Sequence, residues 1–163
     1  MKKRNKIRNV AIGAVVAALY VVLTYLTNLL GLANGAIQVR FSEMLTILPV
    51  FTPAAIPGLF VGCIVSNLLT GCALWDIVFG SLATLIGAIG TYLLRKHTLL
   101  ATIPPILANS VIVPLVLLFV YSFEGTYFYF FATVGAGEII SCGVLGTVLC
   151  ANLKKRNIFI NKM

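Results

Sequence analysis

The chain has 163 residues, of which 60% are hydrophobic and 10% are charged, and its formal net charge is +8. A soluble domain of this size needs far more surface charge, so the composition excludes a soluble protein and indicates an integral membrane protein. The positive charge does not indicate a nucleic-acid partner. The basic residues gather beside apolar runs, where they orient a membrane protein and contact anionic lipid headgroups. These clusters lie at residues 2–8, 95–96 and 154–162.

The first apolar run predicts a helix over residues 10–30 that is retained in the mature protein, because the run is longer than the core of a signal peptide. Ala14 and Ala18 lie four residues apart in this run. Small residues at this spacing let another helix approach closely. Alanine is also common in membrane helices, so the residues alone leave the role of this stripe open.

Prolines divide the next apolar stretch into two short helices, predicted at 43–53 and 54–70. The first is too short to cross the hydrocarbon core, so it is either tilted and continued past Pro53 or one arm of a broken hairpin. Three longer helices are expected further along the chain, at residues 75–94, 99–121 and 127–153.

Six transmembrane helices place all three basic clusters on one side of the membrane, as the orientation rule requires. The sequence therefore predicts an all-α integral membrane protein with one transmembrane domain over residues 1–163 and both termini in the cytoplasm.

Glu138 is the most informative single residue of the sequence. It lies about 16 Å along the last predicted helix from Tyr127, near the middle of the bilayer. A carboxylate at that depth must face a cavity or a partner rather than lipid, and Phe131 shares its helical face. A flat heterocycle with N–H donors would suit such a slot. The competing interpretation is a hydrogen bond from Glu138 to a neighbouring helix.

Other polar residues are expected near the same site. Asn67 and Asn109 offer both donors and acceptors to a ligand, although either could instead join two helices. Arg40, Glu43 and Asp76 are expected at the outer mouth, where an ion pair between the first two would be the simplest alternative.

No catalytic motif accompanies these residues: the sequence has no P-loop, no H-E-x-x-H and no G-x-S-x-G. The four cysteines form no C-x-x-C pair and are expected to pack in the core rather than bind metal. We therefore expect neither an enzyme nor a metal or cofactor.

The stretch Ile37-Gln38-Val39-Arg40-Phe41-Ser42-Glu43 resembles the QueT-type queuosine-precursor transporter family, as do Leu48-Pro49, residues 51–59 and residues 76–84. Members of this family are substrate-binding (S) components of energy-coupling factor (ECF) transporters. The resemblance implies a six-helix S component that captures a 7-deazaguanine such as preQ1 from outside and topples to deliver it. It also implies three partner subunits, one coupling T subunit and two ATPases, and docking of the T subunit on Ala14 and Ala18.

With this ligand in mind, Glu138 is expected to read the guanine-like edge, and Glu43 or Asp76 to meet the amine of the aminomethyl precursor. Stacking on the ligand is expected from four aromatic residues: Phe41, Trp75, Tyr127 and Phe131. The two asparagines are expected to supply further hydrogen bonds. The alternative function is a self-sufficient secondary carrier with Glu138 as a proton-coupled acid. A membrane enzyme or a structural subunit is a third class, which lacks support in the residues.

Overall fold

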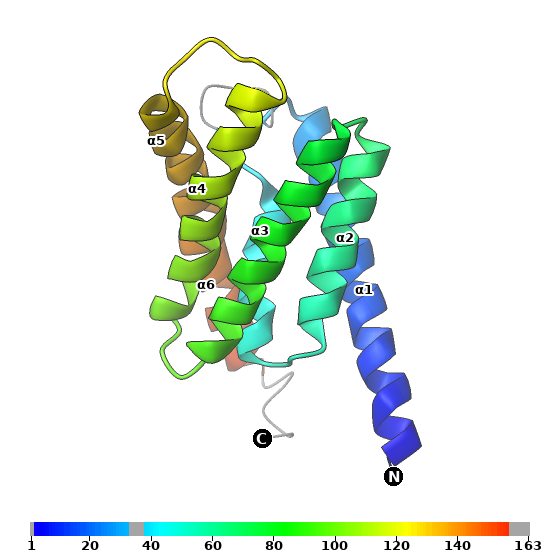
Figure 1. Cartoon of the computed structure of the whole chain (residues 1–163). Coiled ribbons are helices and arrows are strands. Elements are labelled where there is room, and N and C mark those ends of the chain that lie inside the picture. Colours follow the sequence, from blue (N-terminus) through cyan, green and yellow to red (C-terminus); the bar gives the residue numbers. More distant parts are fainter. Residues whose placement is uncertain (1, 33–37, 157–163) are drawn as a thin grey trace.

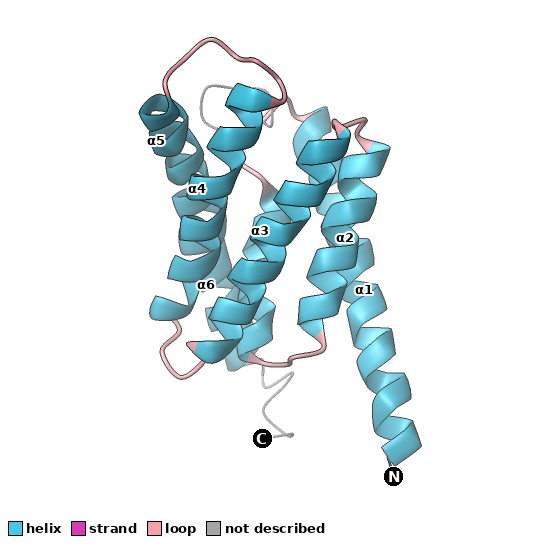
Figure 2. Cartoon of the chain, viewed as in Figure 1, coloured by secondary structure: helices cyan, strands magenta, loops and turns pink. Residues whose placement is uncertain are grey.

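The structure is a computed structural model that describes residues 2–32 and 38–156. These residues form helices and connecting turns and contain no strand (Figure 2). Ile37 of the motif above and Lys162 of the last basic cluster lie outside the described residues. In chain order the elements are α1 (Lys2–Leu29), η1 (Phe41–Val50), α2 (Ala55–Leu69), α3 (Leu74–Leu93), η2 (Leu100–Thr102), α4 (Ile103–Phe119), α5 (Tyr127–Glu138), η3 (Ile139–Leu145) and α6 (Gly146–Lys155).

Four described helical stretches are long and apolar enough to cross a membrane: Asn5–Leu29, Leu74–Leu93, Leu100–Phe119 and Tyr127–Lys155. The two other main helices, η1 and α2, have 10 and 15 residues. At the rise of a 3₁₀- and an α-helix they are about 20 and 22 Å long, less than the roughly 30 Å hydrocarbon core. Length and composition therefore support four spans, and the predicted count of six depends on these two short helices.

η1 is a 3₁₀-helix inside the bundle rather than the start of a long tilted helix. A turn over residues 51–54 separates it from α2, so the broken pair, and not one helix continued through Pro53, describes this region. Proline explains the break, because Pro49 and Pro53 have no amide proton to donate. Most side chains of η1 are buried, and among them is Glu43.

The helix boundaries differ from the prediction at both ends of the chain. α1 begins at Lys2, about two turns before residue 10, because lysine and arginine favour helix and no breaker separates them from the apolar run. The last predicted helix is three consecutive segments, with the π-helical η3 between α5 and α6. The π-turn follows directly after Glu138, and π-turns are frequent at functional sites.

The helices form a row in which α2 packs between α1 and α3, and α4 packs between α3 and α5 (Figure 1). η1 closes this row from inside by contacting α1, α3, η3 and α6. The pair α1–α2 is especially close: a Cβ atom at Gly58 would overlap the backbone of Gly13. Ala14 and Ala18, in contrast, lie on the exposed side of α1.

The described residues of the three basic clusters lie at one end of the bundle, where α1 begins, α3 is connected to α4 and α6 ends (Figure 1). The opposite end carries the α2–α3 turn and the α4–α5 loop. That end, distant from the basic clusters, is where a cavity lined mainly by polar residues opens.

Candidate functional site

A cavity of about 460 Å³ opens between α1, α2, α3 and the α4–α5 loop. This size is within the range of pockets that hold small organic ligands. Most of its lining side chains carry polar groups, although the helices around it are apolar. The lining residues are Thr24, Tyr25, Thr27, Asn28, Gln38, Arg40, Asn67, Thr70, Cys72, Asp76, Leu117, Tyr121 and Phe123.

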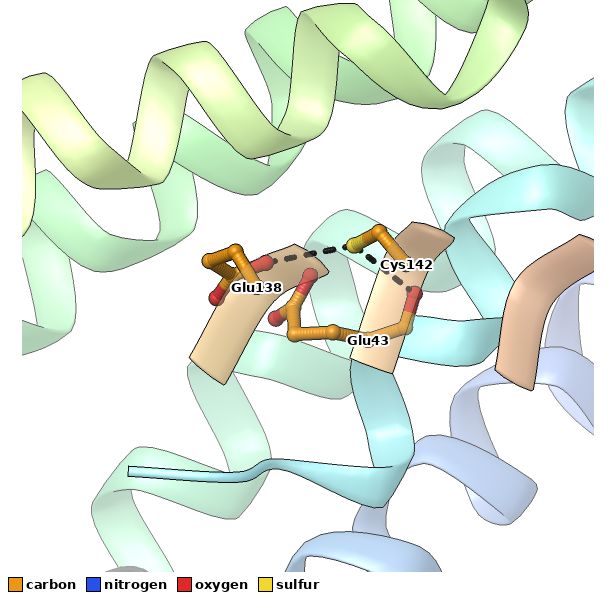
Figure 3. Close-up of side chains that lie close together, drawn as sticks. All are labelled: Glu43, Glu138 and Cys142. Atoms are coloured by element: carbon orange, nitrogen blue, oxygen red, sulfur yellow. Dashed lines mark hydrogen bonds between the residues drawn. The ribbon is translucent and has the colours of Figure 1, made fainter. Parts of the chain in front are cut away.

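Two carboxylates and a thiol from distant parts of the chain meet inside the bundle (Figure 3). Oxygen atoms of Glu43 and Glu138 and the sulfur of Cys142 all lie within 4.8 Å of one another. Cys142 Sγ donates to Glu138 Oε2 at 3.2 Å and contacts the backbone oxygen of Glu43 at 3.4 Å. Glu138 is therefore buried toward the centre of the bundle, away from lipid.

The Glu43 carboxylate is only partly satisfied. Its Oε1 atom accepts a hydrogen bond from the Tyr20 hydroxyl, whereas its Oε2 atom is buried and has no hydrogen-bond partner in the described chain. Asn109 of α4 lies beside both carboxylates, and its Nδ2 atom is also buried without a partner. Unpaired buried polar groups are costly, so a ligand that pairs with them would bind favourably here.

Arg40 connects this acidic centre with the cavity. Arg40 lines the cavity, and its guanidinium lies within electrostatic range of Glu43, Asp76 and Glu138. Over the residues that the structure describes, no carboxylate lies close enough to Arg40 for an ion pair, so the alternative interpretation, a surface ion pair with Glu43, does not apply. One positive charge is thus shared among three acids.

The backbone around Arg40 is held firmly between α1 and η3. The Arg40 amide donates to Ser141 Oγ at 3.1 Å, and the Phe41 amide donates to Thr27 Oγ1 at 3.1 Å. Gly137 allows this approach, because a Cβ atom there would overlap the carbonyl group of Gln38. The segment that carries Arg40 therefore depends on a glycine of α5.

The rim of the cavity has its own hydrogen-bonded group. Tyr121 donates to Asp76 Oδ2 at 2.9 Å and accepts from the Ala73 amide at 3.1 Å. Partial burial, together with the negative charge of Asp76, raises the pKa of Tyr121 to about 12, so the phenol remains a donor at neutral pH. Asn67 and Asp76 both lie over Gly80, where a Cβ atom would be 3.3 Å from Asn67 Nδ2 and 3.5 Å from Asp76 Oδ1.

The structure brings together all six polar residues that the sequence analysis named. Three of them line the cavity: Arg40, Asn67 and Asp76. The other three form the buried centre next to Arg40: Glu43, Asn109 and Glu138.

The four aromatic residues expected to stack on a ligand do not line the cavity; they are Phe41, Trp75, Tyr127 and Phe131. Trp75 is exposed and stacks on Phe79, because Asp76 takes the inward position on α3. Aromatic side chains that do line the cavity are Tyr25, Tyr121 and Phe123.

The two aromatic residues predicted on α5 are displaced for a related reason. The buried stripe of this helix is Phe130, Val134 and Glu138, at four-residue spacing. This stripe leaves Phe131 exposed and directs the Tyr127 hydroxyl to the backbone oxygen of Val111 at 3.3 Å. The face assigned from Glu138 alone was therefore rotated relative to the true interior.

Tyr20 and Cys142 were not predicted as site residues. A signal for Tyr20 was present, because tyrosine usually lies at the membrane interface and this one falls in the middle of an apolar helix. Cys142 follows Glu138 by four residues, at helical spacing, but all four cysteines were interpreted as packing residues. Cys142 and the two glutamates together offer three possible metal ligands. The carboxylate oxygens of the glutamates also suit an organic cation.

Comparison with known proteins confirms the family resemblance. The profile of the family described as QueT transporter matches residues 10–155. Over 85 residues the chain is 39% identical to the Queuosine precursor transporter QueT of Lactococcus lactis subsp. cremoris (strain MG1363). This alignment covers 52% of the chain and 49% of that relative, so the chain matches about half of the relative's length. No solved structure matches.

Proposed function

The chain belongs to the QueT transporter family, and from this premise we propose that it is the substrate-binding component of an ECF transporter that captures a queuosine precursor. The observation that carries the proposal is the cavity together with the buried centre next to Arg40, which gather three carboxylates, two amides and one guanidinium in an apolar protein. Charged groups inside a membrane protein are expensive, and substrate binding is their usual function.

A 7-deazaguanine such as preQ1 fits the chemistry of these groups. Its guanine-like edge presents N–H donors beside a carbonyl acceptor, and carboxylates and amides provide the matching acceptors and donors. The aminomethyl group adds a cation, which suits a site rich in carboxylates. Stacking is supplied by the aromatic side chains that line the cavity, Tyr25, Tyr121 and Phe123, instead of those named from the sequence.

Calorimetric titration of the purified chain with the aminomethyl precursor tests the proposal. The substitution Glu138→Gln removes a charged acceptor and is expected to weaken binding about 10- to 100-fold, since hydrogen bonds to charged groups are worth roughly 1.5–3 kcal/mol. Glu124→Gln is the matched control, because Glu124 is exposed in the α4–α5 loop and does not line the cavity. Equal affinities of both variants and the wild type would remove Glu138 from the site.

Transport is proposed to require a T subunit and two ATPases, with Ala14 and Ala18 as the docking stripe. Their exposure on α1 supports this role, because the small residues that pack α1 on α2 lie on another face of the helix. The rival is a proton-coupled carrier. Uptake by the chain alone in liposomes under a proton gradient would favour the carrier, and uptake only with the ATPase module would support the ECF component.

We also propose that the chain crosses the membrane six times with both termini in the cytoplasm. The position of the described residues of the three basic clusters at one end of the bundle supports this orientation. Reporter fusions at the two termini are expected to give cytoplasmic signals. A periplasmic or extracellular signal from either terminus would overturn this topology.

A further inference from the structure

The charges around Arg40 do not balance. Three of the four acidic residues of the chain lie within electrostatic range of Arg40: Glu43, Asp76 and Glu138. Arg40 contributes the positive charge of this group. If all three are ionised, the group has two more negative than positive charges. In a water-poor interior such an excess is unfavourable unless a carboxylate takes up a proton or another cation is present. A positively charged ligand would offset the excess.

The excess is concentrated between Glu43 and Glu138. Both side chains are more than nine-tenths buried, and their ligand oxygens and Cys142 Sγ lie within 4.8 Å of one another. Tyr20 fixes one oxygen of Glu43, and the other oxygen has no partner. Asn109, which belongs to a different helix, has an unpartnered amide nitrogen at the same place. The unpaired Glu43 oxygen is a free acceptor for a cation, whereas the Asn109 amide nitrogen is a donor and would pair with an acceptor group of the same ligand.

The spacing suits a primary ammonium group. An ammonium nitrogen that donates to two carboxylate oxygens at about 2.7–2.9 Å and tetrahedral angles separates them by roughly 4.4–4.7 Å. This separation is compatible with the observed limit of 4.8 Å. A neutral hydroxyl, with a single proton, can donate to only one of the two carboxylates.

We propose that Glu43 and Glu138 together bind the ammonium group of the substrate, and that the pair selects a cationic 7-substituent over a neutral one. This inference depends on the proposed function. It changes the assignment made from the sequence, because Glu138 then meets the amine. The guanine-like edge is left to Asp76 and Asn67 at the rim, where a carboxylate and an amide lie over Gly80.

The experiment compares three ligands on the full wild-type chain by calorimetry: 7-aminomethyl-, 7-hydroxymethyl- and 7-cyano-7-deazaguanine. The hydroxymethyl compound has nearly the same shape as the aminomethyl compound but no charge. The expected result is a preference of about 10- to 100-fold for the amine over both neutral ligands. In Glu43→Gln and Glu138→Gln this preference is expected to fall toward one, whereas the Glu124→Gln control retains it.

The outcomes separate this inference from the proposed function. If all three ligands bind the wild type equally well, the ammonium site is refuted and 7-deazaguanine binding stands. If none binds, the proposed function fails and the inference fails with it. If a chelator such as EDTA abolishes binding of the amine, the three ligand atoms belong to a metal ion and the ammonium site is also refuted. The wild-type comparison needs no substituted protein, so a variant that fails to fold does not affect it.

Discussion

Replacing Tyr20 by phenylalanine tests whether the buried centre is held as the structure indicates. The substitution removes one hydroxyl group and keeps the ring, so the packing of α1 against its neighbours changes little. Glu43 Oε1 loses the hydrogen bond from this hydroxyl, and because Oε2 already has no partner, neither carboxylate oxygen is then paired. The cost is the loss of a hydrogen bond to a buried charged group, about 1.5–3 kcal/mol.

Thermal unfolding in detergent measures this cost. For a chain of this length, 1 kcal/mol corresponds to roughly 2–4 °C, so a loss of about 2 kcal/mol lowers Tm by roughly 4–8 °C. Tyr129→Phe is the matched control: Tyr129 is 51% exposed on α5, and its hydroxyl makes no hydrogen bond in the described structure. If Tyr20→Phe and Tyr129→Phe unfold at the same temperature, Tyr20 does not stabilise Glu43 and the buried centre is described incorrectly.

Three further predictions concern the segment of Arg40, the cavity mouth and the docking stripe. Gly137→Ala forces a Cβ atom against Gln38. Overpacking a core costs roughly 1–3 kcal/mol, so Tm is expected to fall by several degrees. Gly143→Ala, whose Cβ atom would make ordinary contacts of 3.7 and 3.8 Å, is the control, and equal Tm values of the two variants would contradict this prediction. Cys72 lines the cavity, whereas the other three cysteines are buried. A saturating ligand is therefore expected to slow maleimide labelling of Cys72 about tenfold or more, because only the small fraction of protein without ligand can react. An unchanged labelling rate would place the ligand elsewhere. Ala14→Leu combined with Ala18→Leu is expected to reduce ATP-dependent uptake while calorimetric affinity stays at the wild-type value, because both side chains are exposed away from the cavity. Undiminished uptake would exclude the stripe as the docking surface.

Much of the fold followed from residue type and order. The long apolar runs, the interrupting prolines and the position of the basic clusters predicted a helical membrane protein. Most of its helices begin and end within a few residues of the predicted positions. Two features were not accessible in this way. The 3₁₀ geometry of η1 and the π-turn of η3 depend on how these segments pack against other helices, because apolar content is the same for each type of helix.

The candidate site shows the same division. Polar residues in an apolar chain are conspicuous, and all six that the sequence analysis named lie in the cavity wall or in the buried centre next to Arg40. The four aromatic residues named there do not line the cavity, and aromatic side chains are equally suited to facing lipid, the membrane interface or a ligand. Their type therefore carries little information about their direction.

Composition and charge pattern were sufficient to identify a membrane protein with costly polar groups in its interior, because the free energy of burying a charge is a property of the residue itself. Helical periodicity states which residues share one face, but it does not state how that face is turned toward the neighbouring helices. Glu43 and Glu138 are far apart in sequence, and their meeting beside Arg40 depends on the packing of η1 inside the bundle. That juxtaposition, from which the charge excess and the ammonium site follow, was decided by tertiary structure alone.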